Sequence, residues 1–251
     1  MYRTEHRIDR TDRVDGVSFA NAFLAGLSRD DARAVAATAM RVTLASGDPA
    51  VPEGQQASLW LPETAVLSFG EALGGRLIEC GIIGREGLVG WEPATGIAPS
   101  AAIGVLIRGT ALVVPGERVS ALCAERPTLA AALLRYRETL VAQMRATIAA
   151  RLHCRPEARL ARWLCMLHDR VEGDTLDITH LRLADFLASR RAGVTDSLHL
   201  LEGERVLRCT RGKIVVRSRA ALEQAAGECY GAAERVHRAL VGPFGKVAAA
   251  A

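Results

Sequence analysis

The spacing of apolar and polar residues divides the chain into segments with different predicted structure. In residues 21–40 the apolar positions recur near helical spacing, which predicts one helix or two short paired helices. Between residues 41 and 118, short apolar runs alternate with Gly- and Pro-rich turns such as Gly47-Asp48-Pro49. Short strands at such regular spacing are typical of a small β-barrel or jelly roll. We therefore predict a sensor-like β-barrel domain over residues 1–126.

A long amphipathic helix is expected over residues 127–153, because apolar side chains recur there every three or four residues. The stripe consists of Leu129, Leu133, Tyr136, Leu140, Met144 and Ile148. At about 1.5 Å per residue the helix would be roughly 35 Å long, more than a compact barrel can cover. We predict that the stripe is a dimer interface with a second copy of the chain. The alternative is a helix packed wholly on its own domain.

Residues 177–201 have the pattern of two short helices joined by a break. Thr179 suits the N-cap of the first helix, which would be buried through Leu183, Ala184 and Leu187. The second helix would bury Val194, Leu198 and Leu201. This leaves four side chains facing outward: Arg190, Arg191, Thr195 and His199. The pattern predicts a helix-turn-helix whose second helix is free to enter a major groove.

A basic hairpin is predicted directly after the helix pair. Two short apolar strands flank Arg211-Gly212-Lys213, where Gly212 suits a tight turn. With this wing, the pattern predicts a winged helix-turn-helix DNA-binding domain over residues 154–231, followed by a C-terminal tail over 232–251. The predicted fold class is α+β: a jelly-roll β-barrel, a long dimerisation helix and a winged helix-turn-helix.

The positive charge of the chain is concentrated in the winged segment. The net charge is +4, and residues 151–219 hold 14 Lys or Arg against nine Asp or Glu. An excess of this kind is the footprint expected of a nucleic-acid partner. No stretch approaches the roughly 18 apolar residues of a membrane span, and the charged N-terminus lacks the apolar core of a signal peptide. We therefore expect a cytoplasmic protein with no membrane partner.

The cysteines and histidines favour neither a metal site nor a bound cofactor. Cysteines occur at positions 80, 123, 154, 165, 209 and 229, without a CxxC pair, so we expect incidental thiols rather than disulfides, zinc or iron–sulfur ligands. His6 is the only histidine before His153, which disfavours haem and a barrel-based metal enzyme. We predict that the chain is not an enzyme.

Several motifs resemble those of the Crp/Fnr family of bacterial regulators. The run from RLARWL at residue 159 through RAGVT and RGKI to CYG at residue 231 is similar to the family's C-terminal domain. VPEGQ, LPETAVLSF and IIGREGLVG resemble its barrel more loosely. The resemblance covers about residues 21–231. It implies a cyclic-nucleotide-binding-like barrel, a dimerising helix and a winged helix that binds a palindromic operator.

The resemblance also implies roles for the recognition helix. Arg191 matches the family's recognition arginine, and a guanidinium can contact O6 and N7 of guanine together. Arg190 is the second candidate for a base contact, and Asp196 could accept from a cytosine amino group. Well-studied members carry Glu and Arg at the positions of Ala192 and Asp196, so we expect a different operator. The candidate phosphate contacts are Thr179, Ser189, Thr195, His199, Arg211 and Lys213.

The effector site departs from the pattern of cyclic-nucleotide binders. Arg85 stands where those proteins have a ribose-binding Glu, and Pro99 stands where they have a phosphate-binding Arg. Binding of cAMP or cGMP is therefore not expected. The candidate effector pocket, for an unidentified ligand, consists of Arg85, Glu86 and Ser100.

These patterns predict a sequence-specific, homodimeric transcription regulator that binds double-stranded DNA, with RNA polymerase as a further partner. A winged helix used only for protein contacts is the main alternative, and the basic faces of the recognition helix and wing argue against it. A barrel-based enzyme is the less favoured one.

Overall fold

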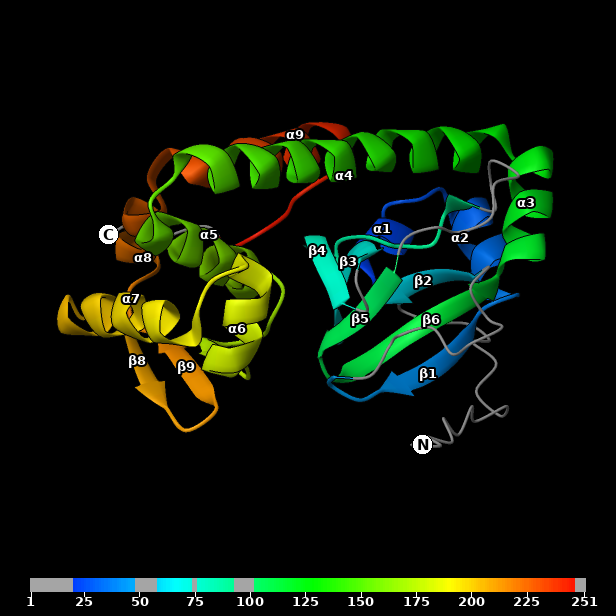
Figure 1. The fold of residues 1–251 in the computed structure, drawn as a ribbon. Coiled ribbons are helices and arrows are strands. Elements are labelled where there is room, and N and C mark those ends of the chain that lie inside the picture. The colour runs from blue at the N-terminus through cyan, green and yellow to red at the C-terminus, as the bar shows by residue number, and fades with distance from the viewer. Residues whose placement is uncertain (1–19, 48–57, 74–75, 93–101, 247–251) are drawn as a thin grey trace.

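The computed structural model describes residues 20–47, 58–73, 76–92 and 102–246 (Figure 1). Two short helices, α1 (Ala22–Ala25) and α2 (Arg29–Ala36), precede the strands. The described strands of this half are β1 (Met40–Leu44), β2 (Ser58–Pro62), β3 (Val66–Leu73), β4 (Arg76–Ile83), β5 (Ala102–Ile107) and β6 (Gly109–Pro115). The helix pair and the strands lie where the sequence pattern predicts them.

The strands form two antiparallel three-stranded sheets, β1-β6-β2 and β4-β3-β5. Apolar residues from both sheets, among them Leu61, Leu67 and Leu112, are buried in one core. The pairing of β2 with β6 runs in register from Ser58 opposite Pro115 to Pro62 opposite Ala111. Two packed sheets of this kind are typical of a jelly roll, and the predicted α+β fold class is confirmed.

Helix α3 (Gly116–Glu125) leads into the long helix α4 (Pro127–His153), which runs along the top of the molecule above both halves (Figure 1). The winged half follows as α5 (Pro156–His168), β7 (Thr175–Leu176), α6 (His180–Leu187), α7 (Arg191–Gly203), β8 (Leu207–Thr210), β9 (Lys213–Val216) and α8 (Arg219–Ala226). In Figure 1 this half lies beneath one end of α4 and the sheets lie beneath the other.

The apolar stripe of α4 mostly faces the chain's own core. Leu129, Leu133, Tyr136 and Leu140 are buried with the residues of the sheets, and Met144 packs against the same cluster half-buried. Only Ile148 is open, with 59% of its surface exposed. The four buried side chains are therefore not available to a second copy in this arrangement, because α4 lies along the sheets over its first half.

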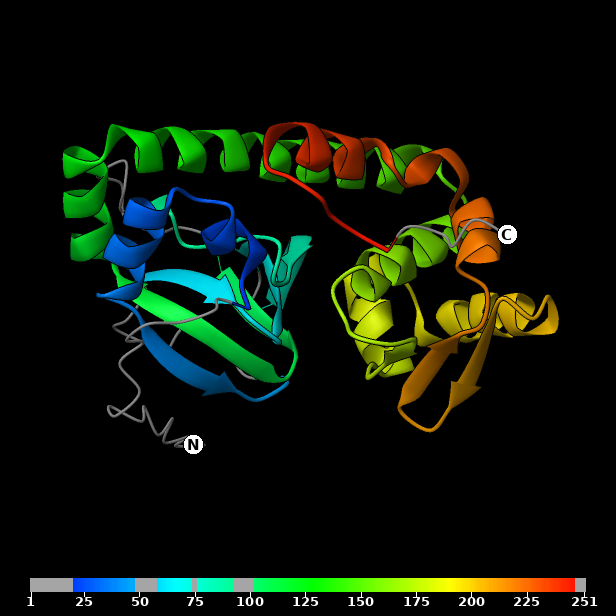
Figure 2. The ribbon, with the colours of Figure 1, turned by 180° about the vertical axis from the view of Figure 1, so that it is seen from behind.

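The C-terminal segment contains a helix where the sequence suggested only a tail. After the 3₁₀ turn η2 (Gly227–Cys229), helix α9 (Ala232–Leu240) packs along α4 (Figure 2). Its buried residues are Ala233, Glu234 and His237, and the His237 ring lies edge-on to that of Tyr136. Glu234 accepts a hydrogen bond from the Gly231 N–H at 2.9 Å, which satisfies a free donor at the start of the helix.

The return of α9 along α4 also corrects the expectation for two cysteines. Cys154, directly after α4, and Cys229, at the end of η2, form a disulfide with 6.6 Å between their Cα atoms. The partners are 75 residues apart in sequence, and packing of α9 on α4 brings them together. The expectation of incidental thiols was wrong for this pair. Cys80, Cys123, Cys165 and Cys209 are free thiols.

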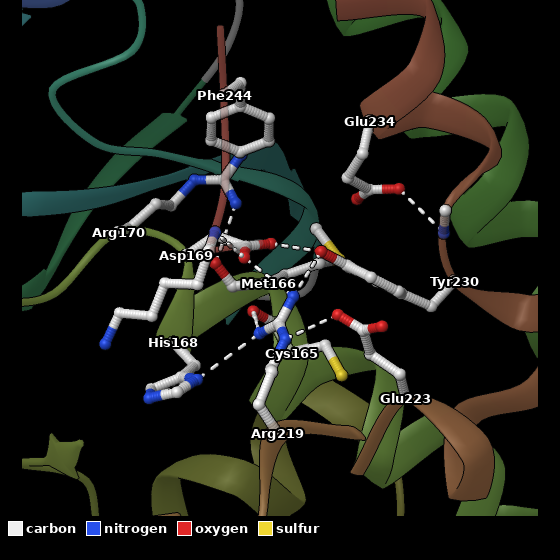
Figure 3. A network of polar contacts seen from close by, with 12 residues as sticks. Cys165, Met166, His168, Asp169, Arg170, Arg219, Glu223, Tyr230, Glu234 and Phe244 are labelled. Carbon is white, nitrogen blue, oxygen red and sulfur yellow. Dashed lines mark hydrogen bonds and ion pairs between the residues drawn. The ribbon is translucent and has the colours of Figure 1, made fainter. Parts of the chain in front are cut away.

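A buried carboxylate joins α5, α8 and the C-terminal segment (Figure 3). The side chain of Asp169 is fully buried and accepts hydrogen bonds from the Arg219 guanidinium (2.7 Å), from the Tyr230 hydroxyl and from the Lys246 backbone N–H (3.0 Å). Arg219 also donates to the Cys165 carbonyl at 2.9 Å. Burial raises the pKa of Asp169, and Arg219 acts in the opposite direction.

Replacing Arg219 should destabilise the winged half. In Arg219→Met the Asp169 carboxyl stays buried without its cation, and breaking a buried pair in this way costs about 3 kcal/mol or more. Denaturant unfolding followed by circular dichroism measures the change. Arg217→Met, at an exposed position two residues away, is the matched control and should change the unfolding free energy by less than about 0.5 kcal/mol. Equal stability of the two variants would contradict the importance of the Asp169 cluster.

Candidate DNA-binding interface

Helices α6 and α7 form the predicted helix-turn-helix. The Thr179 hydroxyl accepts from the Arg182 N–H at 3.2 Å and so caps α6, as predicted. Helix α6 ends at Leu187, its C-cap Ala188 has a left-handed backbone with φ 47°, and α7 starts three residues after that cap, at Arg191. Each helix buries the apolar residues that the spacing predicts. The sequence pattern did not single out Phe186, which is buried 4.6 Å from the ring of Trp163 and joins α6 to α5.

The first turns of α7 expose the predicted recognition face. Arg190 is the N-cap residue of α7, and it is exposed together with Arg191, Asp196 and His199. Between them lie Ala192 and Gly193, both exposed, and a Cβ added at Gly193 would meet only the Ser189 hydroxyl, at 3.6 Å. Small residues beside two guanidinium groups leave room for a base edge to approach the helix backbone.

Two of the residues predicted to contact phosphates are not fully free for that role, because one already donates a hydrogen bond and the other is half-buried. The Thr195 hydroxyl donates to the Arg191 carbonyl at 3.0 Å, and Ser189 is half-buried. On the wing, Gly212 has φ 74°, as its turn requires, and Arg211 is exposed. Lys213 is half-exposed, and its ammonium lies 4.0 Å from the Asp177 carboxylate. The structure thus places the helix pair and the wing in one domain, with most of their basic side chains open.

His180 belongs to this surface, although the sequence pattern did not single it out. It is the first residue of α6, and its Nδ1 lies 3.2 Å from the Thr195 hydroxyl. Burial, together with Arg191 and His199, lowers the pKa of His180. The predicted N-cap at Thr179 was the available signal, since it makes residue 180 the start of a helix next to the recognition face.

Ion pairs hold the helix-turn-helix against the sheets. Arg182 of α6 pairs with Glu79 of β4 at 2.9 Å, and Glu79 is almost fully buried. Arg151 of α4 donates to the carbonyls of Glu79 and Phe186 at 3.3 and 3.1 Å. Beside these contacts, a cleft of about 370 Å³ separates the β5–β6 turn from α6 and the wing tip, with Arg108, Thr179 and Gly212 in its lining.

Two of the candidate effector residues have charged partners in the winged half. Glu86 is buried, where its carboxylate accepts from the Gly84 N–H at 3.0 Å and pairs with Arg170 at 2.8 Å. Arg85, with 55% of its side chain exposed, lies 3.7 Å from Glu172. Ser100 lies outside the described residues. The turn that matches the ribose-binding turn of cyclic-nucleotide binders therefore makes an internal contact between the two halves of the chain.

Two further kinds of feature are absent from the described part of the chain. No group of three or more His, Cys, Asp or Glu side chains there could hold a metal ion. Among the helices of that part, none is long and apolar enough to cross a membrane.

Comparison with known proteins agrees with this geometry. Residues 158–225 match the family model described as a Crp-like helix-turn-helix domain. No curated protein matches the chain. Among solved structures, a CRP-family transcriptional regulator from Thermus thermophilus is similar, with 21% identity and a TM-score of 0.62. That match covers 76% of this chain and 98% of the Thermus protein.

FixK2 from Bradyrhizobium japonicum is also similar, with 17% identity, a TM-score of 0.64 and coverage of 75% of this chain and 98% of FixK2. At these identities the structures show a shared fold. The matched helix-turn-helix model and the shared fold together support a DNA-binding transcription regulator of the Crp/Fnr type. The resemblance seen in the sequence is confirmed.

Burial of Glu79 makes stability depend on pH. Burial is the main cause that raises the pKa of Glu79 from its ordinary 4.5 to about 7, and Arg182 acts against it. Between these values the folded protein binds more protons than the unfolded chain, so stability falls as the pH rises through this window.

Glu79→Gln should flatten that dependence, because the amide does not titrate. Urea unfolding at several pH values between about 5 and 7 measures it, with exposed Glu172→Gln as the control. A Glu79→Gln variant that keeps the full pH dependence of the wild type would contradict the assignment.

Proposed function

We propose that the chain binds a palindromic operator as a homodimer, with α7 of each copy in a major groove. The exposed N-terminal turn of α7 carries this proposal: two arginines are followed there by two small residues, on a helix whose opposite face is buried. This is the arrangement by which a recognition helix reads bases.

Base reading is assigned to Arg191 first and Arg190 second. Arg191 contacts a guanine through two hydrogen bonds, while Asp196 accepts from a cytosine amino group. The small side chains of Ala192 and Gly193 let the helix approach the base edges. Because this set differs from that of well-studied family members, the operator differs as well.

Phosphate contacts fix the position of the reader without reading sequence. We assign them to Thr179, Ser189, His199 and Arg211, with weaker contributions from Thr195 and Lys213, which have partners in the chain. His180 joins this set because its position at the start of α6 places a backbone N–H and an imidazole on the same surface.

The dimer uses the face of α4 that its own chain leaves open. Leu134, Ile148 and Leu152 have 57%, 59% and 84% of their surface exposed, and Val141 is half-buried. Residues 134, 141 and 148 are seven apart, the repeat of a coiled-coil seam. Of the stripe predicted from sequence, Ile148 belongs to this seam and the half-buried Met144 lies beside it.

The remaining roles follow from the regulator class. The protein acts in the cytoplasm, contacts RNA polymerase when bound to DNA, and has no catalytic role. Its barrel senses a signal other than a cyclic nucleotide, a proposal supported by the use of Glu86 to bind Arg170 instead of a ligand.

Arg191→Ala should weaken binding to the operator more than it weakens binding to DNA of random sequence. An operator is first selected from random duplexes with the wild-type protein. Loss of a bidentate guanine contact costs about 1–3 kcal/mol, so binding to this operator should weaken roughly tenfold or more, with little change on random DNA. Fluorescence anisotropy measures both. The control Arg118→Ala removes an exposed positive charge from α3 and should bind like the wild type. Unchanged operator affinity in Arg191→Ala would contradict base reading by this residue.

Ile148→Glu should shift the protein towards monomer, because a carboxylate in a coiled-coil seam must be desolvated. Operator binding should weaken with it, since two half-sites need two recognition helices. Sedimentation velocity reports the oligomeric state. Leu73→Glu, at a position on β3 with 70% exposure, is the matched control and should remain dimeric. The seam is excluded as the interface if Ile148→Glu sediments as a stable dimer.

A further inference from the structure

The disulfide between Cys154 and Cys229 closes a loop around the entire winged half. Cys154 is the C-cap residue of α4, just before Pro156 opens α5, and Cys229 ends η2 just before α9. Residues 155–228 lie between them. The disulfide therefore ties together the two ends of the winged half, where it leaves α4 and where it enters α9. With the disulfide open, only the peptide backbone would connect the winged half to its neighbours: residues 154–156 to α4, and the segment after η2 to α9.

The pair is placed to react with a small thiol. Both cysteines are half-buried, so each keeps part of its surface open to solvent. Among the free thiols, Cys165 is buried, and burial raises the pKa of Cys165, Cys123 and Cys209, that of Cys209 to about 11. Thiols of this kind are poor nucleophiles near neutral pH.

Opening the bond would affect contacts that orient the reading surface. The winged half is docked on the sheets by the buried pairs Arg170–Glu86 and Arg182–Glu79. In this docked arrangement Thr179 and Gly212 line the cleft that faces Arg108 of the sheet domain. A cleft of about 370 Å³ has the size of a small-molecule site, so a DNA duplex does not fit between Arg108 and the Thr179 and Gly212 side of the winged half.

We propose that Cys154 and Cys229 form a redox latch: the disulfide holds the winged half in the docked arrangement, which binds DNA weakly. Reduction frees the winged half to turn about residues 154–156, so that α6 and the wing can reach phosphates on both sides of α7. This inference rests on the proposed function. DNA-binding proteins of the cytoplasm work where thiols are kept reduced, and disulfides there are mostly transient and redox-sensing.

The chemistry is thiol–disulfide exchange with a low-molecular-weight disulfide such as oxidised glutathione. One cysteine thiolate attacks the small disulfide and expels a thiolate, which leaves a mixed disulfide. The second cysteine thiolate then attacks the protein sulfur of that mixed disulfide and expels the second small thiolate. The protein pair loses two electrons and two protons, and the small disulfide is reduced to two thiols.

The test compares the full-length protein equilibrated with oxidised glutathione or with excess dithiothreitol. If the bond leaves about a tenth of the molecules undocked, operator affinity is about tenfold weaker in the oxidised protein. Cys154→Ser and Cys229→Ser should each bind in both buffers as the reduced wild type does. Cys123→Ser replaces a half-buried thiol of α3 and should keep the wild-type response.

Two results of the thiol and DNA-binding measurements would each overturn the latch. The first is the finding, by alkylation and mass spectrometry, that Cys154 and Cys229 both remain free thiols in oxidised glutathione. The second is equal operator affinity of the oxidised and the reduced wild-type protein.

Hydrogen exchange separates failure of the latch from failure of the proposed function. Protection of β4 around Glu79 and of α6 should be higher in the oxidised protein, whether or not any DNA binds. If DNA binding is absent in both buffers but this difference is present, the proposed function fails and the latch stands. If the exchange of these segments is the same in both buffers, the latch fails.

Discussion

The arrangement of the molecule depends on the long helix α4, because different parts of its surface contact the sheets, contact α5 or remain exposed. Its first half buries Leu133 and Tyr136 against the sheets. Further along it turns polar, and Gln143 accepts from the Ile82 N–H of β4 at 2.7 Å, while Thr147 accepts from the buried Arg162 of α5 at 3.2 Å. The remaining face carries exposed Leu134 and Ile148. One helix therefore positions the sheets, α5 and the proposed second copy.

The two halves of the chain meet through apolar surface and through buried charges. Val66, Ile82 and Leu106 of the sheets are buried in the same apolar cluster as the core of the winged half. Glu79–Arg182 and Glu86–Arg170 both place a buried carboxylate of the sheet domain on a guanidinium of the winged half. Desolvation offsets much of the attraction in such pairs, but breaking one leaves a costly unpaired charge. Buried charge pairs of this kind specify one docked geometry while adding little net stability. They suit a DNA reader whose orientation is regulated, and the disulfide at Cys154 adds a covalent restraint to the same joint.

The winged half could be predicted from sequence because its information is local. The cap at Thr179, the buried spacing of both helices and the turn at Gly212 each depend on neighbours within a few residues. The stripe on α4 shows the limit of that approach. Helical periodicity identifies a face to be buried, but it does not say whether the sheets or a second copy covers that face.

Features that depend on the return of α9 could not be predicted in this way. The buried face of α9 includes the polar residues Glu234 and His237 beside Ala233, so its burial depends on packing against α4 and not on apolar residues alone. Without that helix, nothing indicates that Cys154 and Cys229 meet. The same holds for Glu86, whose neighbour Arg170 comes from the other half of the chain. Among site residues, His180 was missed because its role depends on the packing of α6 beside α7.

The central claim is that two copies read one palindrome with α7 helices held at a fixed separation. The most direct measurement is operator affinity as a function of the spacing between half-sites, using the reduced protein and the duplex selected from random DNA. Inserting about 10 base pairs restores the relative facing of the two half-sites, whereas inserting about five turns them to opposite sides of the duplex. The account predicts that the five-base-pair insertion weakens binding to the level of a single half-site. Equal affinity for the unmodified and five-base-pair-spaced duplexes would contradict a dimeric reader.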